Sequence, residues 1–167
     1  MLLEQELLSN FSTLGFQGVL QHISKKCVHP NKPFITEGVG LVFYNGCEDS
    51  ANRLVYVFDK KGRWLNADKT MCVQPKGGLV HPPNRTPLEF SRSCGKASIF
   101  RPLSNGAIQH VTSGMCVHPN FGTAKPEDDE LVVLYEGCHF EKLKFSIPNA
   151  RSIGRIQYTD RNLKKFD

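Results

Sequence analysis

Residues 113–138 read SGMCVHPNFGTAKPEDDELVVLYEGC, and related stretches occur twice earlier in the chain. The segments that enter the first cysteine are LQHISKKCVHP (20–30), LNADKTMCVQP (65–75) and IQHVTSGMCVHP (108–119). The segments that close on the second cysteine are LVFYNGC, PLEFSRSC and LVVLYEGC. Cys27 precedes Cys72 by 45 positions and Cys72 precedes Cys116 by 44. The sequence therefore predicts three tandem repeats, each of one supersecondary unit.

Runs of β-branched and aromatic residues within each repeat predict short strands. In the third repeat these runs are IQH, CVHP, LVVLY and KLKFSI, and the gaps between them carry Pro, Gly and Asn. No helical period follows residue 20. We therefore expect an all-β domain. Its expected parts are an N-terminal extension (1–18), a three-repeat domain (19–150, with repeats 19–63, 64–106 and 107–150) and a C-terminal strand and tail (151–167).

Six cysteines form an even set, with two in each repeat. The second follows the first by 20, 22 and 22 positions, and none lies in a CxxC pair. If the repeats are alike in structure, the pair in one repeat implies the same pair in all. This symmetry predicts the disulfides Cys27–Cys47, Cys72–Cys94 and Cys116–Cys138, each worth about 3 kcal/mol. Free, buried cysteines are the alternative. Disulfides persist in oxidising compartments, so we expect a secreted, extracellular protein.

Composition and motifs exclude several functions. The formal net charge is +5, but charges of both signs are interspersed and no Lys/Arg run exceeds a pair, so no nucleic-acid footprint is expected. No segment is long and apolar enough to insert into a membrane. The chain lacks the GxSxG and HExxH motifs, and the predicted disulfides leave no thiol nucleophile. We expect a binding protein and not an enzyme.

Four contiguous acids, Glu127, Asp128, Asp129 and Glu130, follow Pro126 in the third repeat. Calcium takes six to eight oxygen ligands, which these carboxylates could supply together with backbone carbonyls and Asn120. Two adjacent sugar hydroxyls could then complete the coordination sphere. The alternative is a solvated surface turn, because the run has no EF-hand pattern.

Histidine and tyrosine recur at fixed places in the first and third repeats. His29 and His118 follow the first cysteine by two positions, and Tyr44 and Tyr135 precede the second by three. A neutral imidazole can hydrogen-bond a sugar hydroxyl, and a flat ring can cover the apolar face of galactose. The alternatives are a turn-capping histidine and a half-buried packing tyrosine. Repeat two has Gln74 in place of the histidine, so we expect it to bind least.

The repeats resemble those of the ricin-B-type lectins. The order of an entering strand, a Cys-Val, a polar loop, an apolar strand ending in Cys and a closing apolar strand is similar over residues 19 to about 147. This resemblance implies a β-trefoil-like fold and a sugar site in which Asn52, after the second cysteine of repeat one, bonds the ligand. Two departures stand out: the family's Gln-x-Trp is missing, and Ile156-Gln157-Tyr158 suggests a fourth entering strand for which a closed barrel has no place.

The motifs CVHPN (27–31 and 116–120), YNGC, YEGC and PEDDELVVLY also resemble a narrower group, the cnidarian (sea-anemone) galactose-binding lectins with Cys-Val-His-Pro repeats. That resemblance implies a calcium-dependent, homodimeric lectin for glycans ending in β-linked galactose. The expected sugar-binding residues are His118, Asn120, Tyr135, His29, Tyr44 and Asn52, with the metal held by residues 127–130. A structural or protein-binding β-trefoil without metal or sugar is the alternative function.

Overall fold

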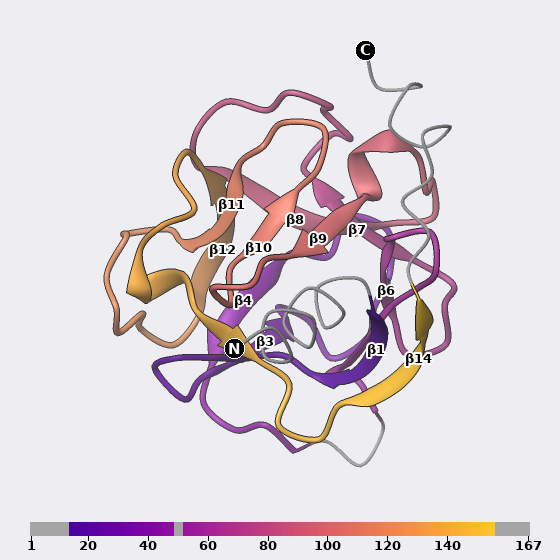
Figure 1. Ribbon diagram of the computed structural model, residues 1–167, viewed down its shortest axis with the longest axis horizontal. Coiled ribbons are helices and arrows are strands. Elements are labelled where there is room, and N and C mark those ends of the chain that lie inside the picture. The colour runs from indigo at the N-terminus through magenta and orange to yellow at the C-terminus, as the bar shows by residue number, and fades with distance from the viewer. Residues whose placement is uncertain (1–13, 49–51, 156–167) are drawn as a thin grey trace, which may run out of the picture.

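The computed structural model describes residues 14–48 and 52–155, and within them it contains short strands, two one-turn 3₁₀ helices and no α-helix (Figure 1). In chain order the elements are β1 (Leu14–Val19), β2 (Gln21–His22), β3 (Cys27–Pro30), β4 (Leu41–Tyr44), β5 (Val55–Phe58), β6 (Trp64–Asn66), β7 (Cys72–Pro75), β8 (Thr86–Ser91), η1 (Lys96–Ser98), β9 (Phe100–Pro102), β10 (Ile108–His110), β11 (Cys116–Pro119), β12 (Glu130–Tyr135), η2 (Glu141–Leu143), β13 (Phe145–Ser146) and β14 (Arg151–Arg155). None of the described helices could span a membrane.

The three repeats share one strand pattern and one register. The antiparallel hairpins β3–β4, β7–β8 and β11–β12 pair the first cysteine of each repeat with Tyr44, Ser91 and Tyr135 respectively. The last strand of each repeat pairs with the first strand of the next, as β5 with β6, β9 with β10 and β13 with β2. The β13–β2 pair closes the ring. The predicted three-repeat, all-β, trefoil-like fold is confirmed.

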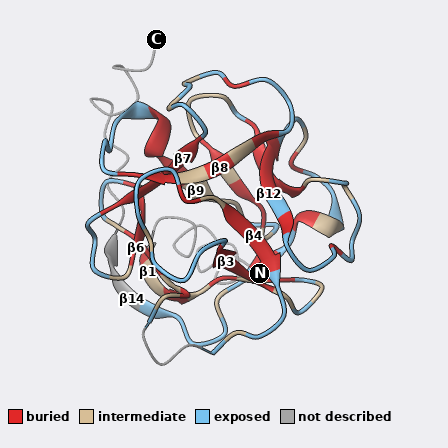
Figure 2. Cartoon of the chain, turned by 180° about the vertical axis from the view of Figure 1, so that it is seen from behind, coloured by how far each residue is buried: buried red, intermediate tan, exposed pale blue. Residues whose placement is uncertain are grey.

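The core is built from equivalent positions of the three repeats. Figure 2 shows the buried residues on the strands and the exposed residues on the connecting loops. The equivalent buried sets are Val28, Val73 and Val117; Phe43, Phe90 and Leu134; Tyr56, Phe100 and Phe145; and Leu20, Trp64 and Ile108. Trp64 lies between repeats, with ring centroids 5.6 Å from Tyr56 and 5.2 Å from Phe100. Each such large apolar side chain contributes roughly 1.5–3 kcal/mol on burial.

A disulfide closes the loop of each repeat. The bonds join Cys27 to Cys47, Cys72 to Cys94 and Cys116 to Cys138, as predicted, and none of the described cysteines is free. The Cα–Cα separations are 5.5, 5.6 and 5.5 Å, within the usual range for a disulfide. The bonds fix the backbone just after the strand that carries Tyr44, Ser91 or Tyr135.

A buried polar side chain orders the turn before each first cysteine. These equivalent residues are His22, Asn66 and His110. His110 Nδ1 is 2.7 Å from Ser113 Oγ, and its Nε2 donates to the Ala97 carbonyl at 2.9 Å. Asn66 does the same work in repeat two, where its Oδ1 accepts the Met71 N–H at 3.0 Å. Burial lowers the pKa of His110 to about 4, so this imidazole is neutral at pH 7.

The C-terminal strand runs along the outside of the ring. β14 pairs antiparallel with β1, whose other neighbour is β5. An additional strand therefore adds to the edge of β1 and takes no place in the three-fold arrangement. The fourth entering strand expected at Ile156–Tyr158 lies outside the described residues, as does most of the expected N-terminal extension.

Candidate saccharide sites

Repeats one and two each form a surface hollow where the Pro-containing turn meets the neighbouring repeat. The hollow of repeat one, called site 1, has a volume of about 510 Å³ and is lined by His29, Asn31, Tyr44, Arg53 and Asp129, among others. The hollow of repeat two, site 2, has about 690 Å³, and its lining includes Gln74, Ser91, Ala97, Glu37 and Glu89. The equivalent place in repeat three, site 3, brings together His118, Asn120, Tyr135, Lys142 and Arg85.

The two histidines are held in the same way. His29 Nε2 lies 2.7 Å from the Gly46 carbonyl and His118 Nε2 lies 2.9 Å from the Gly137 carbonyl. A carbonyl only accepts hydrogen bonds, so Nε2 carries the proton in both. Burial lowers the pKa of His118, with the nearby Lys142 charge acting in the same direction, so its ring is neutral at pH 7. Nδ1 of this ring is then an acceptor suited to a hydroxyl group.

A half-exposed tyrosine stands beside each histidine. Tyr44 is 42% exposed and Tyr135 is 40% exposed, and each ring centroid lies 5.5 Å from its histidine. The structure therefore brings together the pairs His29–Tyr44 and His118–Tyr135 that the sequence singled out. An exposed ring next to a buried polar group can cover an apolar sugar face while the polar group orients the hydroxyls.

Each site is completed by a turn of the adjacent repeat. In each case a side-chain oxygen of that turn accepts the backbone N–H of the residue that follows the site tyrosine or serine. At site 1 Asp128 accepts from Asn45 N at 3.1 Å, at site 2 Glu37 accepts from Arg92 N at 2.7 Å, and at site 3 Asn84 accepts from Glu136 N at 2.9 Å. We call this the inter-repeat clasp. The next residue in each turn has a positive φ: Asp129 at 67°, Gly38 at 83° and Arg85 at 70°. These three residues face sites 1, 2 and 3.

The four acids expected to hold calcium do not come together. Asp128 accepts bonds from Lys26 Nζ at 2.9 Å and from the Asn45 backbone, and the Lys26 bond is the main reason that its pKa is lowered. Glu130 is buried, and its oxygens accept the N–H groups of Phe121 and Glu127. Asp129 lines site 1 in the neighbouring repeat.

A calcium site needs convergent oxygens, and this donor set diverges. Within residues 14–48 and 52–155, no group of three or more His, Cys, Asp or Glu side chains is placed to hold a metal ion. The residues expected as ligands therefore do not fit a calcium ion bound by the protein alone. The calcium dependence that the sequence led us to expect is therefore left to the chelation experiment proposed below.

The remaining expected sugar ligands, Asn120 and Asn52, differ in position. Asn120 is at site 3, where its Oδ1 accepts from Arg85 Nε at 3.3 Å. Asn52 is exposed, has a φ of 56° and accepts the Val55 N–H through its carbonyl, and it is not among the residues that line site 1. Its neighbour Arg53 lines that hollow instead.

Sequence reasoning missed three cationic residues. Arg53 Nη1 donates to the Lys32 carbonyl at 3.1 Å and supports the Pro-containing loop of site 1. Lys142 holds the equivalent place in repeat three, and Ala97 holds it in repeat two, each three positions before the buried aromatic of the closing strand. Counting backwards from Tyr56, Phe100 and Phe145 would have found this position. Arg85 sits in a turn that carries no signal of its own, because its site belongs to another repeat.

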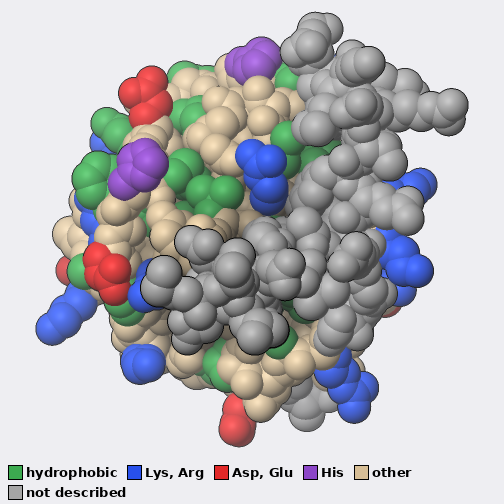
Figure 3. All heavy atoms as spheres, viewed as in Figure 1, with side chains coloured by type: hydrophobic (Ala, Val, Ile, Leu, Met, Phe, Trp, Pro, Cys, Tyr) green, Lys and Arg blue, Asp and Glu red, His purple; other side chains and the backbone are tan. Residues whose placement is uncertain are grey.

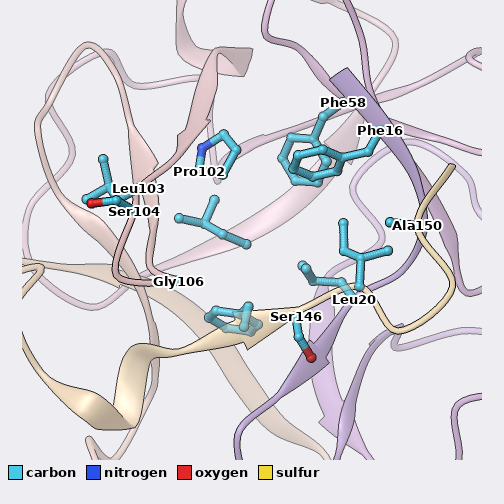
Figure 4. Close-up of a pocket in the computed structure, with 12 residues that line it drawn as sticks. Phe16, Leu20, Phe58, Pro102, Leu103, Ser104, Gly106, Ser146 and Ala150 are labelled. Atoms are coloured by element: carbon cyan, nitrogen blue, oxygen red, sulfur yellow. The ribbon is translucent and has the colours of Figure 1, made fainter. Parts of the chain in front are cut away.

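A separate apolar cavity of about 310 Å³ lies where β1, the loop after β9 and the segment after β13 meet (Figure 4). Phe16, Leu20, Phe58 and Ile147 are among its lining residues, and the rings of Phe16 and Phe58 lie together on one side of it. Ser104 and Ser146 supply its side-chain hydroxyls. A sugar needs several convergent polar groups, so this cavity is not a candidate saccharide site.

Comparison with known proteins agrees with the fold. The chain is similar to the C-half of an earthworm R-type lectin in complex with GalNAc (10% identity, TM-score 0.62, covering 83% of this chain and 98% of that chain). It is also similar to the designed three-fold symmetric protein ThreeFoil (12%, 0.64, 80% and 96%). A third similar structure is a non-toxic homologue of type II RIPs from Momordica charantia (bitter gourd), bound to α-methyl-D-galactoside (11%, 0.63, 83% and 49%).

At these identities the similar structures establish the fold alone, which is that of β-trefoil lectins. No curated protein sequence matches the chain, and the likeness to cnidarian lectins stays an expectation. The model of one lectin family matches residues 18–150, the whole three-repeat region. Its members are carbohydrate-binding lectins whose description names the α-anomer of galactose. The chain belongs to this family, the α-D-galactose-binding lectins called MytiLec.

Proposed function

We propose that the protein binds terminal galactose residues of glycans at sites 1 and 3. The observation that carries the proposal is the repeated pair of a buried, Nε2-protonated histidine and a half-exposed tyrosine, present as His29–Tyr44 and His118–Tyr135. The tyrosine ring would cover the apolar face of the sugar, and the neutral His118 would accept a hydroxyl through Nδ1. In site 1, the Asp129 carboxylate of the adjacent repeat would accept a second hydroxyl.

Site 2 has a different chemistry. Gln74 replaces the histidine, Ser91 replaces the tyrosine, and Ser91 Oγ already donates to Glu37 at 2.7 Å. Gly77 N–H donates to Glu89 at 2.8 Å, so this carboxylate is held inside the turn. Without a flat ring, this hollow lacks the main apolar contact of the other two sites. We therefore expect galactose to occupy two sites in each chain.

The test is a titration of the labelled protein with methyl α-galactoside, methyl β-galactoside and methyl α-glucoside, followed by the amide signals of each site. We expect galactosides to shift the signals of residues 29–31, 44–46, 118–120 and 135–137, and the glucoside to shift them less, because its O4 is equatorial. The two anomers decide between the α-linkage of the family description and the β-linkage that the cnidarian likeness implies. If neither galactoside shifts these amide signals, the proposal is contradicted.

Repeating the titration with a chelator present tests whether galactose binding depends on calcium. Because the carboxylates of residues 127–130 diverge and Asp128 is paired with Lys26, we expect binding to survive the removal of divalent ions. Loss of binding on chelation, restored by added calcium, would instead support the expected calcium dependence.

Two sites in one chain also bear on assembly and location. Crosslinking of cells requires at least two sites in one particle, which a monomer of this chain would provide. The expected homodimer is therefore a separate proposal, tested by the mass of the protein in solution.

The three disulfides support secretion, because such bonds are rare in reducing compartments.

A further inference from the structure

We propose that site 3 prefers an anionic galactoside, one that carries a sulfate or a carboxylate, and that Arg85 is the residue that sets this preference. The inference rests on the proposed function, because it assigns a ligand class to one of the galactose sites. It comes from comparing the same position in the three inter-repeat turns.

The backbone of these turns makes the same hydrogen bond in all three repeats, although the side chains differ. Asp129 N–H donates to the Phe43 carbonyl at 2.9 Å, Gly38 N–H to Phe90 at 2.8 Å, and Arg85 N–H to Leu134 at 2.8 Å. All three residues have a positive φ, which disfavours any side chain other than that of glycine. Gly38 shows that the fold itself needs no side chain here. An arginine at this strained position therefore points to a role for its guanidinium group.

The guanidinium group lies at the edge of site 3. Arg85 Nε donates to Asn120 Oδ1 at 3.3 Å, and Arg85 is exposed to solvent. Asn120 comes directly after His118 and Pro119, so this bond holds the guanidinium group beside the segment that carries His118. A guanidinium group can bind sulfate or carboxylate through two parallel hydrogen bonds.

A second cation borders the same site. Lys142 Nζ lies close to the loop after Asn120, 3.5 Å from the position that a Cβ on Gly122 would occupy. The charge of Lys142 also helps to lower the pKa of His118, after the larger effect of burial. Site 3 thus has a positive charge from each of two repeats.

Sites 1 and 2 lack this charge balance. In site 1 the cations Arg53 and Lys32 are opposed by the Asp129 carboxylate. In site 2 the two equivalent positions are Ala97 and Gly38, and Lys96 is outnumbered by the carboxylates of Glu37 and Glu89. An anionic ligand would be disfavoured at site 2 and gain less at site 1 than at site 3, so the preference should be strongest at site 3.

Acids also lie near site 3, and Glu127 and Glu141 line a separate hollow together with Lys142. The buried Glu130 directs its oxygens to the Phe121 and Glu127 backbone, below the loop. Glu136 follows Tyr135, and its backbone N–H is held by Asn84. Replacing Glu136 with Asn, the residue that repeat one carries as Asn45, removes this opposing charge. We expect Glu136→Asn to strengthen the preference for anionic galactosides.

The test compares methyl α-galactoside with the 3-, 4- and 6-sulfates of galactose and with galacturonic acid, in titrations of the full chain. At low ionic strength, at least one anionic galactoside should bind site 3 about threefold to tenfold more tightly than the neutral sugar, as expected for one or two partly exposed charge pairs. About 0.5 M salt should remove most of this gain. The sulfate and galacturonate arms show which anion is preferred.

Arg85→Gly is the decisive variant, because Gly38 already occupies the same position in repeat two with the same backbone bond. It should fold normally and lower the ratio of anionic to neutral galactoside affinity, with both affinities measured on the same variant. Lys69→Gly is the matched control. It removes one exposed cation from another positive-φ position, φ 62°, in the turn before Cys72, and should leave the preference unchanged.

Two results overturn the inference: no anionic galactoside binds site 3 more tightly than the neutral sugar, or Arg85→Gly keeps the preference. In both cases binding of the neutral galactoside leaves the proposed function standing. If the unaltered protein binds neither kind of galactoside, the proposed function fails as well.

Discussion

Repeat two and repeat three share a backbone but present different groups to solvent. Both have the same hairpin register, the equivalent disulfide and large apolar residues at the equivalent core positions. At the surface, however, Gln74 and Ser91 in repeat two stand where repeat three has His118 and Tyr135. The positions that build the barrel therefore constrain the residue type in all three repeats, while the positions at the hollows do not. The differences between repeats mark the residues that the fold does not require.

The largest expected effect comes from the shared framework. Removing one disulfide, as Cys72→Ala with Cys94→Ala or as Cys116→Ala with Cys138→Ala, should each cost about 3 kcal/mol of unfolding free energy, because the loops closed are of equal length. Urea denaturation measures this cost. The third-repeat variant should also weaken galactose binding at site 3, because the Gly137 carbonyl that holds His118 precedes Cys138. Clearly unequal stability costs would show that the frameworks are not equivalent.

A second difference between the repeats lies at the buried turn, where repeat three has His110 and repeat two has Asn66. The pKa of His110 is lowered to about 4, so protons bind the unfolded chain first as the pH falls below about 6.5. Stability that is fully present above pH 6.5 should therefore fall by about 2 kcal/mol between pH 6.5 and 5 through this residue alone. Denaturant midpoints across this range measure the change.

His110→Asn places the repeat-two residue at this turn and is the control. Its stability should depend less on pH over the same range, with the remaining slope due to the other buried histidines, His22 and His118, whose pKa values are also lowered by burial. The same slope in the variant and in the unaltered protein would mean that His110 is not the group that titrates.

A third experiment turns site 3 into site 2. His118→Gln with Tyr135→Ser installs the two residues of repeat two, and should weaken galactose binding at site 3 about tenfold, or roughly 1.4 kcal/mol, because the ring contact and the acceptor are lost. Since Tyr135 is 40% exposed, the thermal midpoint should change little. The same pair at site 1, His29→Gln with Tyr44→Ser, should affect only site 1. Unchanged binding in both variants would place the sugar elsewhere.

The smallest effect is expected at the inter-repeat clasp. Asn84 takes the place of Asp128 at another repeat boundary, so Asp128→Asn should keep the bond to the Asn45 backbone. It should lose the exposed pair with Lys26 and the bond from Asn45 Nδ2, because one oxygen becomes an NH2 group. Asp128→Ala removes all three bonds and should lower the thermal midpoint further than Asp128→Asn does. If the two variants behave alike, the clasp contributes nothing measurable.

The sequence predicted the features that recur in every repeat and missed the contacts that join one repeat to another. The spacing of Cys27, Cys72 and Cys116 was sufficient for the three repeats and the disulfides, because a three-fold structure repeats its local contacts. The His–Tyr pairs were also found, since both members belong to one hairpin. Asp129 and Arg85 could not be assigned to sites 1 and 3, because Asp129 lies 85 positions from Tyr44 and Arg85 lies 50 positions from Tyr135, each in another repeat. Only the closed ring brings them together.

Charge is a further case in which the sequence alone was insufficient. Four contiguous acids indicated a calcium loop, but the turn directs them outward, toward a lysine, and inward, toward backbone N–H groups. Contiguity in sequence does not imply convergence in space on a turn. The Lys and Arg side chains, by contrast, are spread around the face shown in Figure 3 without forming one patch, as the interspersed charges predicted.

The clasp has a consequence for how such a lectin can change. Each site is completed by a turn of a neighbouring unit. A substitution in one unit's turn therefore alters recognition in another unit. An isolated unit, even if it folded, would present half a binding surface. New ligand preferences can therefore arise without touching the histidine and tyrosine that hold the sugar, through exchange of the single residue that the adjoining unit contributes.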